Sequence, residues 1–161
     1  MYQTSDKILP LTQLQRRINA WRVRGETIVF TNGCFDLLHL GHVDYLEKAQ
    51  ALGDRLVIGL NSDTSVRQLK GENRPFQDEN TRARLLAAME FVDAVYVFPE
   101  ETPRDLIALL QPDVLVKGAD YQPEEVAGAE LLATWGGRLE LIPLTPDTST
   151  SSLADRIRNQ G

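Results

Sequence analysis

The stretch FTNGCFDLLHLGH occupies residues 30–42 and joins two kinds of sequence pattern. Before it, the apolar, β-branched run ETIVFTN (26–32) stops at Gly33; after it, a helical pattern begins. Both histidines of the chain, His39 and His42, lie in this stretch. A short buried strand that ends on a glycine and leads directly into a helix predicts the first unit of an α/β sheet.

Four more short apolar runs follow along the chain and alternate with helical patterns. The further predicted strands are 54–63, 93–98, 113–118 and 138–144. The predicted helices are 10–25, 42–53, 81–92, 102–112, 122–137 and 150–159. This alternation predicts an α/β fold with a doubly wound, Rossmann-like, five-stranded parallel sheet. We expect one domain over residues 1–161, with a helical leader over 1–25 packed outside the core.

The connection from Ser65 to Asn80 is long, polar and without a clear period. It carries Lys70, Gly71 and Arg74. A long loop in a compact domain is more often functional or mobile than structural. We therefore expect Lys70 to lie on a mobile loop that closes over a ligand, although an exposed basic pair often only solvates a loop.

Polar residues follow the carboxyl ends of three predicted strands. They are the stretch 30–42 after the first strand, NSD (61–63) at the end of the second, and KGAD (117–120) at the end of the fourth. In a doubly wound sheet, ligands bind beyond the carboxyl ends of the strands, where the strand order reverses. The fold class therefore predicts that these three segments share one edge.

Composition limits the classes of function. The net charge of -6 argues against a general nucleic-acid surface, but a small phosphate ligand needs only a local cationic pocket. Cys34 is the only cysteine, which excludes an intrachain disulfide and suits a reducing compartment. No apolar run reaches the length of a membrane span, and the N-terminus lacks the apolar core of a signal peptide. We expect a cytoplasmic protein with neither nucleic-acid nor membrane partners.

His39, Gly41 and His42 form an H-x-G-H motif at the predicted helix start. A helix N-terminus favours anions, and imidazole N–H donors beside it would complete a phosphate cradle. Gly41 and Gly33 would let a ligand approach the backbone. This arrangement suits attack on a phosphorus atom. The alternatives are two ordinary polar residues at a helix start, or a zinc site, which lacks a third ligand with recognisable spacing; we expect no metal site built from protein ligands.

The segment GCFDLLHLGH (33–42) resembles the signature of the cytidylyltransferase-like nucleotidyltransferases, and the resemblance extends over residues 27–158. Within that family, LKGENRP (69–75) and DVLVKGADYQPEEVAGAE (113–130) resemble the branch that acts on D-glycero-β-D-manno-heptose 1-phosphate. The resemblance implies transfer of AMP from ATP to this sugar phosphate, with pyrophosphate release and ADP-heptose formed for lipopolysaccharide core synthesis. It also implies Mg²⁺, a homodimer, and a stand-alone form linked in function to a separate heptose kinase.

The same resemblance implies roles for individual residues. His39 and His42 would stabilise the transition state at the α-phosphorus, and Lys70 and Arg82 would bind phosphates. The implied nucleotide-binding residues are Thr31, Asn32, Gly33, Cys34, Phe35, Gly41, Lys117, Gly118, Asp120, Thr148, Ser149, Thr150 and Ser151. Independently of the resemblance, we expect Asp36, Asn61, Asp63 and Arg74 to contact the sugar phosphate.

Two of these positions depart from the family's pattern or allow a simpler reading. In TPDTSTSSL (145–153), Thr148 stands where isoleucine is usual and Ser151 replaces a threonine, so the packing of this loop is in question. Asp36 could bind substrate hydroxyls or cap its own turn. Cys34 suits packing better than a nucleophilic role.

The sugar phosphate would be its own nucleophile, because its second pKa is about 6 and its oxygen is ionised at neutral pH. No general base is then needed, and no Ser/His/Asp or Cys/His constellation is apparent in the sequence. Two alternatives remain open. One is a cytidylyltransferase that uses CTP with glycerol 3-phosphate or a similar polyol or aminoalcohol phosphate. The other is a nucleotide-binding module without turnover; a redox Rossmann protein is disfavoured because G-x-G-x-x-G is missing.

Overall fold

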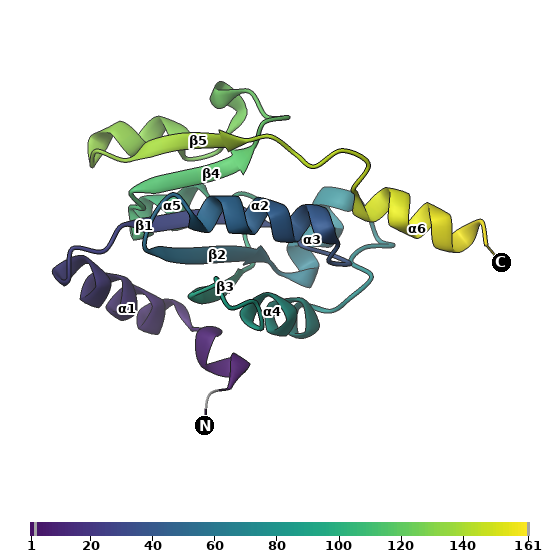
Figure 1. The fold of residues 1–161 in the computed structure, drawn as a ribbon, viewed down its shortest axis with the longest axis horizontal. Coiled ribbons are helices and arrows are strands. Elements are labelled where there is room, and N and C mark those ends of the chain that lie inside the picture. Colours follow the sequence, from purple (N-terminus) through teal and green to yellow (C-terminus); the bar gives the residue numbers. More distant parts are fainter. Residues whose placement is uncertain (2, 161) are drawn as a thin grey trace.

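The computed structural model describes residues 1 and 3–160, and its centre is a five-stranded sheet in the order β3-β2-β1-β4-β5 (Figure 1). The strands are β1 (Ile28–Gly33), β2 (Arg55–Asn61), β3 (Ala94–Phe98), β4 (Val114–Gly118) and β5 (Arg138–Ile142). All neighbouring strands pair in parallel. The prediction of a doubly wound parallel sheet is confirmed.

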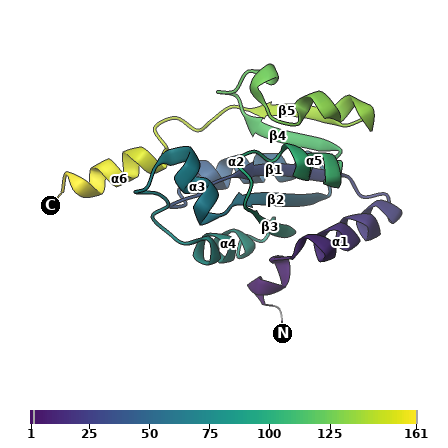
Figure 2. The same ribbon diagram turned by 180° about the vertical axis from the view of Figure 1, so that it is seen from behind.

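Helices cover both faces of the sheet (Figures 1 and 2). They are α1 (Leu11–Val23), α2 (Leu40–Gln50), α3 (Asp63–Lys70), α4 (Glu79–Ala87), α5 (Arg104–Leu110) and α6 (Thr150–Arg158), with 3₁₀ turns η1 (Thr4–Lys7), η2 (Pro123–Glu125) and η3 (Ala129–Thr134). Residues of α1 and α5 pack on the sheet face that carries Ile28 and Phe30. Residues of α2 and α4 pack on the face that carries Val29. The alternation along β1 therefore serves two cores.

Three local predictions need correction. The segment 65–80 is not one loop, because α3 occupies its first part; the Ser62 hydroxyl caps this helix by accepting the Ser65 N–H at 3.2 Å. The predicted helix over 122–137 is two 3₁₀ turns, separated at Gly128, whose φ of 86° is left-handed and ends any helix. The leader also joins the core rather than lying outside it, since α1 buries its apolar face there.

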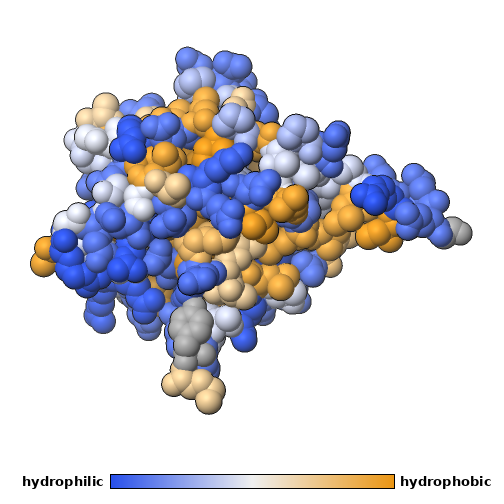
Figure 3. Space-filling model, in the orientation of Figure 1, coloured by the Kyte–Doolittle hydropathy of each residue, from blue (hydrophilic) through white to orange (hydrophobic). Residues whose placement is uncertain are grey.

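The order of the strands locates the site. The chain runs outward from β1 to β3 on one side and returns to pair β4 with β1 on the other, so the strand order reverses between β1 and β4. The carboxyl end of β1 at this reversal leads straight into α2. The arm formed by α6 projects away from the body beyond the same edge, and apolar surface continues from the body onto it (Figure 3). No helix among residues 1 and 3–160 is long and apolar enough to cross a membrane.

Candidate active site

The turn between β1 and α2 is strained and firmly held. Phe35 and Leu37 have φ values of 44° and 43°, in the left-handed region, which costs a non-glycine residue about 1–3 kcal/mol. The Asp36 carboxylate between them accepts the backbone N–H groups of Phe76 at 2.7 Å and Gln77 at 3.1 Å. Phe35 is itself buried. The turn therefore keeps a costly conformation because a distant loop is tied to its centre.

Asp36 is thus occupied by the protein, which corrects its assignment to the sugar phosphate. We expect Asp36→Asn to lower the free energy of unfolding by about 1.5–3 kcal/mol, because a charged acceptor of two amides is lost. The N–H groups of Phe76 and Gln77 should exchange faster with deuterium. Asp155→Asn is the control, because Asp155 is exposed and its ion pair with Arg158 is long, at 3.8 Å. Urea denaturation and hydrogen exchange of both variants provide the measurement; equal effects would contradict the assignment.

The two histidines face each other at the start of α2. His39 is the N-cap residue, and its backbone N–H donates to Nδ1 of His42 at 3.3 Å. The rings stack with their centroids 3.9 Å apart, and the edge of Phe35 packs on His42. Since Nδ1 of a neutral His42 accepts, its proton lies on Nε2, which is left as a donor. Nδ1 of His39 is buried and has no hydrogen-bond partner within the described protein.

Both imidazoles are neutral at pH 7. Burial lowers the pKa of His42 from 6.5 to about 4, with further lowering from His39 and from the positive charge of Lys70. Burial also lowers the pKa of His39. A neutral imidazole at a helix start donates one hydrogen bond and adds no positive charge to the buried turn. The pair can therefore act as fixed hydrogen-bond donors to an anion.

The depressed pKa predicts how stability depends on pH. Between pH 6.5 and pH 4, His42 takes up a proton in the unfolded chain but not in the folded one, so the free energy of unfolding should fall as the pH falls through this range. His42→Asn should remove part of this slope. Denaturation at several pH values measures it, and an imidazole NMR titration checks the cause. A His42 midpoint near 6.5 would contradict the prediction.

Gly41 makes room for another part of the protein rather than for a ligand, which corrects the expectation from the motif. A Cβ on Gly41 would lie 2.2 Å from Oγ1 of Thr148. The Thr148 hydroxyl donates to the Thr145 carbonyl at 2.7 Å, and the Thr145 hydroxyl donates to Asp44 on α2 at 2.8 Å. The connection from β5 to α6 is thereby seated on the first turn of α2.

The first turn of α6 approaches the same turn. Ser149 caps α6, and the Thr150 hydroxyl donates to the main-chain carbonyl of Asp36. Arg74 donates to the Ser151 hydroxyl at 3.3 Å. The N-termini of α2 and α6 therefore meet at one place, and each contributes backbone N–H groups and a positive end of a helix dipole. The predicted Ser/Thr loop is brought to the histidines, although Thr148 and Thr150 direct their hydroxyls to protein carbonyls.

Two cationic side chains border this place. Lys70 is the exposed last residue of α3, close enough for its charge to lower the pKa of His42. Arg74 lies 4.3 Å over the ring of Phe76 and 3.8 Å from the Asp36 carboxylate. These two contacts of Arg74 do not use all of its N–H donors, and Lys70 is exposed. Lys70 and Arg74 are therefore available to an anionic ligand.

The end of β4 supplies a third cation. Lys117 donates to the Asn32 carbonyl at 3.2 Å and lies 5.2 Å from the ring of Tyr121; burial lowers the pKa of Lys117 to about 8. The side-chain oxygen of Asn32 is buried and has no hydrogen-bond partner among residues 1 and 3–160. A Cβ on Gly118 would lie 2.5 Å from Oδ1 of Asp120 and 3.0 Å from Cδ2 of Leu144, so a larger residue there would require these side chains to move. This cluster is adjacent to the β1 end, as the strand order predicts.

Other predicted nucleotide residues are part of the protein interior. Thr31 exposes no surface; its hydroxyl donates to the Val116 carbonyl at 3.0 Å and lies 2.8 Å from the Tyr45 hydroxyl. Its predicted contact with the nucleotide is corrected accordingly. Cys34 is half-buried, and burial raises the pKa of its thiol, which suits a packing residue. Gly33 is close-packed against Phe35.

Arg82 requires the largest correction. Predicted to bind phosphate, it exposes none of its surface and forms an ion pair of 2.7 Å with Asp63. Asn61, also assigned to the sugar phosphate, is buried and donates to the Ser65 hydroxyl at 2.8 Å. A side chain without exposed surface cannot touch a ligand in this conformation. Arg82 and Asn61 are therefore structural residues behind the site, whereas Asp63, whose side chain is 25% exposed, pairs with Arg82 and keeps part of its surface accessible.

Sequence reasoning missed Asp44 and Thr145, which join α2 to the loop before α6, and Tyr45, which packs on Thr31. Their spacing from the motif carries no signal, because each acts through a partner far away in the chain. No group of three or more His, Cys, Asp or Glu side chains that could hold a metal ion occurs in the part of the chain that the structure describes.

The sequence pattern of the cytidylyltransferase-like family matches residues 30–151, which include the whole two-histidine turn and the start of α6. The chain belongs to this family. It is a nucleotidyltransferase.

Curated relatives agree with this assignment. The chain is 51% identical to the bifunctional protein HldE of Magnetococcus marinus, over 99% of this chain and 33% of that protein. It is 58% identical to HldE of Syntrophotalea carbinolica, over 84% of this chain and 28% of that protein. The chain spans about a third of the length of these relatives.

Solved structures share the fold. The lipopolysaccharide core biosynthesis protein from Thermoplasma volcanium has a TM-score of 0.62 at 29% identity, covering 75% of this chain and 98% of that one. The pantoate-beta-alanine ligase from Francisella tularensis has a TM-score of 0.63 at 16% identity, covering 92% of this chain and 72% of that one. At this identity the second likeness concerns the fold alone.

Proposed function

We propose that this enzyme transfers AMP from ATP to a sugar 1-phosphate, D-glycero-β-D-manno-heptose 1-phosphate, and releases pyrophosphate. The main support is one observation: the N-termini of α2 and α6 meet around a stacked pair of neutral histidines, and Lys70 and Arg74 border this place. Support for the sugar comes from the resemblance of residues 69–75 and 113–130 to the heptose phosphate branch. The HldE relatives and the lipopolysaccharide core biosynthesis protein are consistent with it.

In this mechanism the triphosphate lies across the two helix starts. The Nε2–H of His42 donates to a non-bridging oxygen of the α-phosphate, where negative charge grows as the nucleophile attacks in line. His39, whose ring stacks on His42, would donate a second hydrogen bond to the same phosphates. Lys70 neutralises the charge of the departing pyrophosphate. Positioning and electrostatic stabilisation together carry the reaction.

The sugar phosphate supplies its own nucleophile. Its second pKa of about 6 leaves the attacking oxygen ionised at neutral pH, so the site needs no general base. The neutral histidines agree with this, because their role is to donate hydrogen bonds and not to remove a proton. Arg74, whose guanidinium is incompletely paired, is our proposal for a contact to the sugar phosphate.

Mg²⁺ would arrive with ATP as part of the substrate. The described residues offer no cluster of acidic ligands, and Mg²⁺ commonly keeps several waters while binding phosphate oxygens.

The surroundings of Lys117 and Asp120 would hold the base, which we propose to be adenine. The reaction would take place in the cytoplasm. A separate kinase would supply its substrate, the sugar 1-phosphate. We also expect a homodimer, which sedimentation analysis would measure.

A pyrophosphate-release screen tests the proposal. ATP, CTP, GTP and UTP are each paired with heptose 1-phosphate, glycerol 3-phosphate and other sugar and polyol phosphates. We expect the highest kcat/KM for ATP with heptose 1-phosphate. A preference for CTP with glycerol 3-phosphate would overturn the adenylyl assignment in favour of a cytidylyltransferase. Nucleotide binding without release of pyrophosphate from any pair would indicate a binding module.

A further inference from the structure

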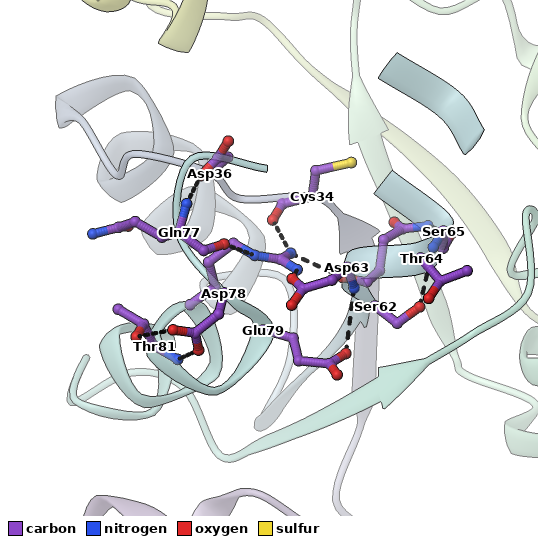
Figure 4. A network of polar contacts seen from close by, with 12 residues as sticks. Cys34, Asp36, Ser62, Asp63, Thr64, Ser65, Gln77, Asp78, Glu79 and Thr81 are labelled. Carbon is purple, nitrogen blue, oxygen red and sulfur yellow. Dashed lines mark hydrogen bonds and ion pairs between the residues drawn. The ribbon is translucent and has the colours of Figure 1, made fainter. Parts of the chain in front are cut away.

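One buried guanidinium joins four parts of the chain behind the site. Arg82 donates through Nη1 to the carbonyls of Cys34 at 2.7 Å and Asn61 at 2.8 Å. Through Nη2 it donates to the Asp63 carboxylate at 2.7 Å, and through Nε to the Gln77 carbonyl at 2.9 Å. Figure 4 labels three of the acceptor residues, Cys34, Asp63 and Gln77, which lie around one centre. All three nitrogens of the side chain are engaged, and none of its surface is exposed.

The acceptors lie in or next to the segments that carry the residues of the proposed site. Cys34 opens the strained turn that leads to the histidines. Asn61 ends β2, and Asp63 is the first residue of α3, whose last residue is Lys70. Gln77 lies in the connection that carries Arg74. A single side chain thus sets the mutual positions of three segments that are far apart in the sequence.

The chemistry of this contact is unusual for a residue whose task is stability alone. Removing a charge from water is costly, and an apolar side chain of similar volume often gives equal or greater stability. Among the described residues, Asp63 is the only carboxylate paired with Arg82, and the other partners of Arg82 are main-chain carbonyls. The planar fork of arginine fixes the directions of several acceptors at once, which a lysine ammonium cannot do.

We propose that Arg82 is a positioning residue: through these four bonds it holds the histidine turn, the Lys70 helix and the Arg74 loop in register, without contacting the phosphates. This rests on the proposed function, in which those three segments surround the triphosphate and the sugar phosphate. Misplacement of reacting groups by about 1 Å can cost about 100-fold in rate. The register that Arg82 maintains is therefore important for kcat even though it lies behind the reaction.

Arg82→Lys tests the proposal kinetically, with Arg84→Lys as the matched control. Arg84 lies on the same helix but is exposed and donates only to Thr4 among the bonds described. We expect Arg82→Lys to lower kcat with ATP and heptose 1-phosphate at least about tenfold and up to about 100-fold, with a smaller change in KM. Arg84→Lys should leave both unchanged. Unchanged kcat in a folded Arg82→Lys protein would overturn the proposal.

Imidazole NMR of the protein without ligand separates positioning from phosphate binding. The only two histidines of the chain are both in the site, so two ring signals report its geometry. We expect Arg82→Lys to shift them with no nucleotide present, and Arg84→Lys to leave them in place. Unshifted rings together with weaker ATP binding would show that Arg82 acts on the ligand and would overturn the proposal. This readout needs no substrate, so it stands even if the screen finds a different reaction.

A milder variant covers the case in which Arg82→Lys does not fold. Asp63→Asn keeps a side-chain oxygen as acceptor for the buried guanidinium and removes only the negative charge, at a side chain that is 25% exposed, so the fold should tolerate it. We expect a smaller shift of the imidazole signals and a smaller loss of kcat in the same direction. If both signals and kcat are those of the wild type, the proposal is refuted.

Discussion

Replacing His42 with alanine is expected to lower kcat by about 100- to 1,000-fold while the fold remains intact, because one preorganised donor to a developing oxyanion is lost. The same range is expected for His39→Ala. The effect should appear in kcat more than in KM, since the charge on the α-phosphate oxygens is greatest in the transition state. Steady-state pyrophosphate release measures it.

The control for this prediction is Lys48→Ala, an exposed change near the end of the same helix. It should leave kcat unchanged. Circular dichroism and the melting temperature establish that each variant is folded. Near-normal turnover in a folded His42→Ala protein would remove this ring from the mechanism and leave the helix N-termini as the main stabilising groups.

Both histidines are needed because of how they are arranged. The backbone N–H of His39 donates to Nδ1 of His42. Only Nε2 of His42 is then left for a ligand, and this nitrogen carries the proton. The stacked rings, 3.9 Å apart, exclude water from each other, which keeps both neutral. Loss of His39 would thus also expose His42 and raise its pKa. The two variants are therefore expected to be non-additive, as groups that act as a unit are.

Much of the fold follows from local sequence patterns. Short apolar runs that alternate with helices identify all five strands, because a buried parallel strand must be apolar on both faces. The H-x-G-H motif marks the site because the strand end and the helix start are adjacent in sequence. The short helix α3 escapes detection, since Val66 is its only buried apolar residue and its cap is a single serine.

The roles of polar residues depend on distant partners and cannot be predicted in the same way. The sequence places a positive charge at Arg82, but only the fold reveals that its acceptors are three main-chain carbonyls and the Asp63 carboxylate, 5 to 48 residues away. Asp36 is likewise a reasonable substrate ligand until the amides of Phe76 and Gln77 are seen to occupy it. The need for glycine at position 41 of the motif likewise depends on a distant residue, because a Cβ there would collide with Thr148.

Gly41→Ala is expected to lower kcat about 100-fold with little loss of stability, because it would move the loop that carries Thr148 by about 1 Å or more. The added Cβ would lie 2.2 Å from Oγ1 and 2.8 Å from Cβ of Thr148, which are both impossible contacts. The helix itself favours alanine over glycine by about 1 kcal/mol. The loop is largely exposed, so it can yield, and the displaced N-terminus of α6 would no longer meet that of α2.

A second substitution tests this cause. Thr148→Gly removes both clashing atoms, so the double variant Gly41→Ala, Thr148→Gly should recover much of the rate lost in Gly41→Ala. Thr148→Gly alone should cost less than Gly41→Ala, because the Thr148 hydroxyl is bonded to the Thr145 carbonyl and not directed at the ligand. Measured kcat/KM values for the four proteins form a double-mutant cycle, in which residues in contact give a large coupling term. Additive losses would show that Gly41 is required by the ligand, as the motif first suggested, and not by Thr148.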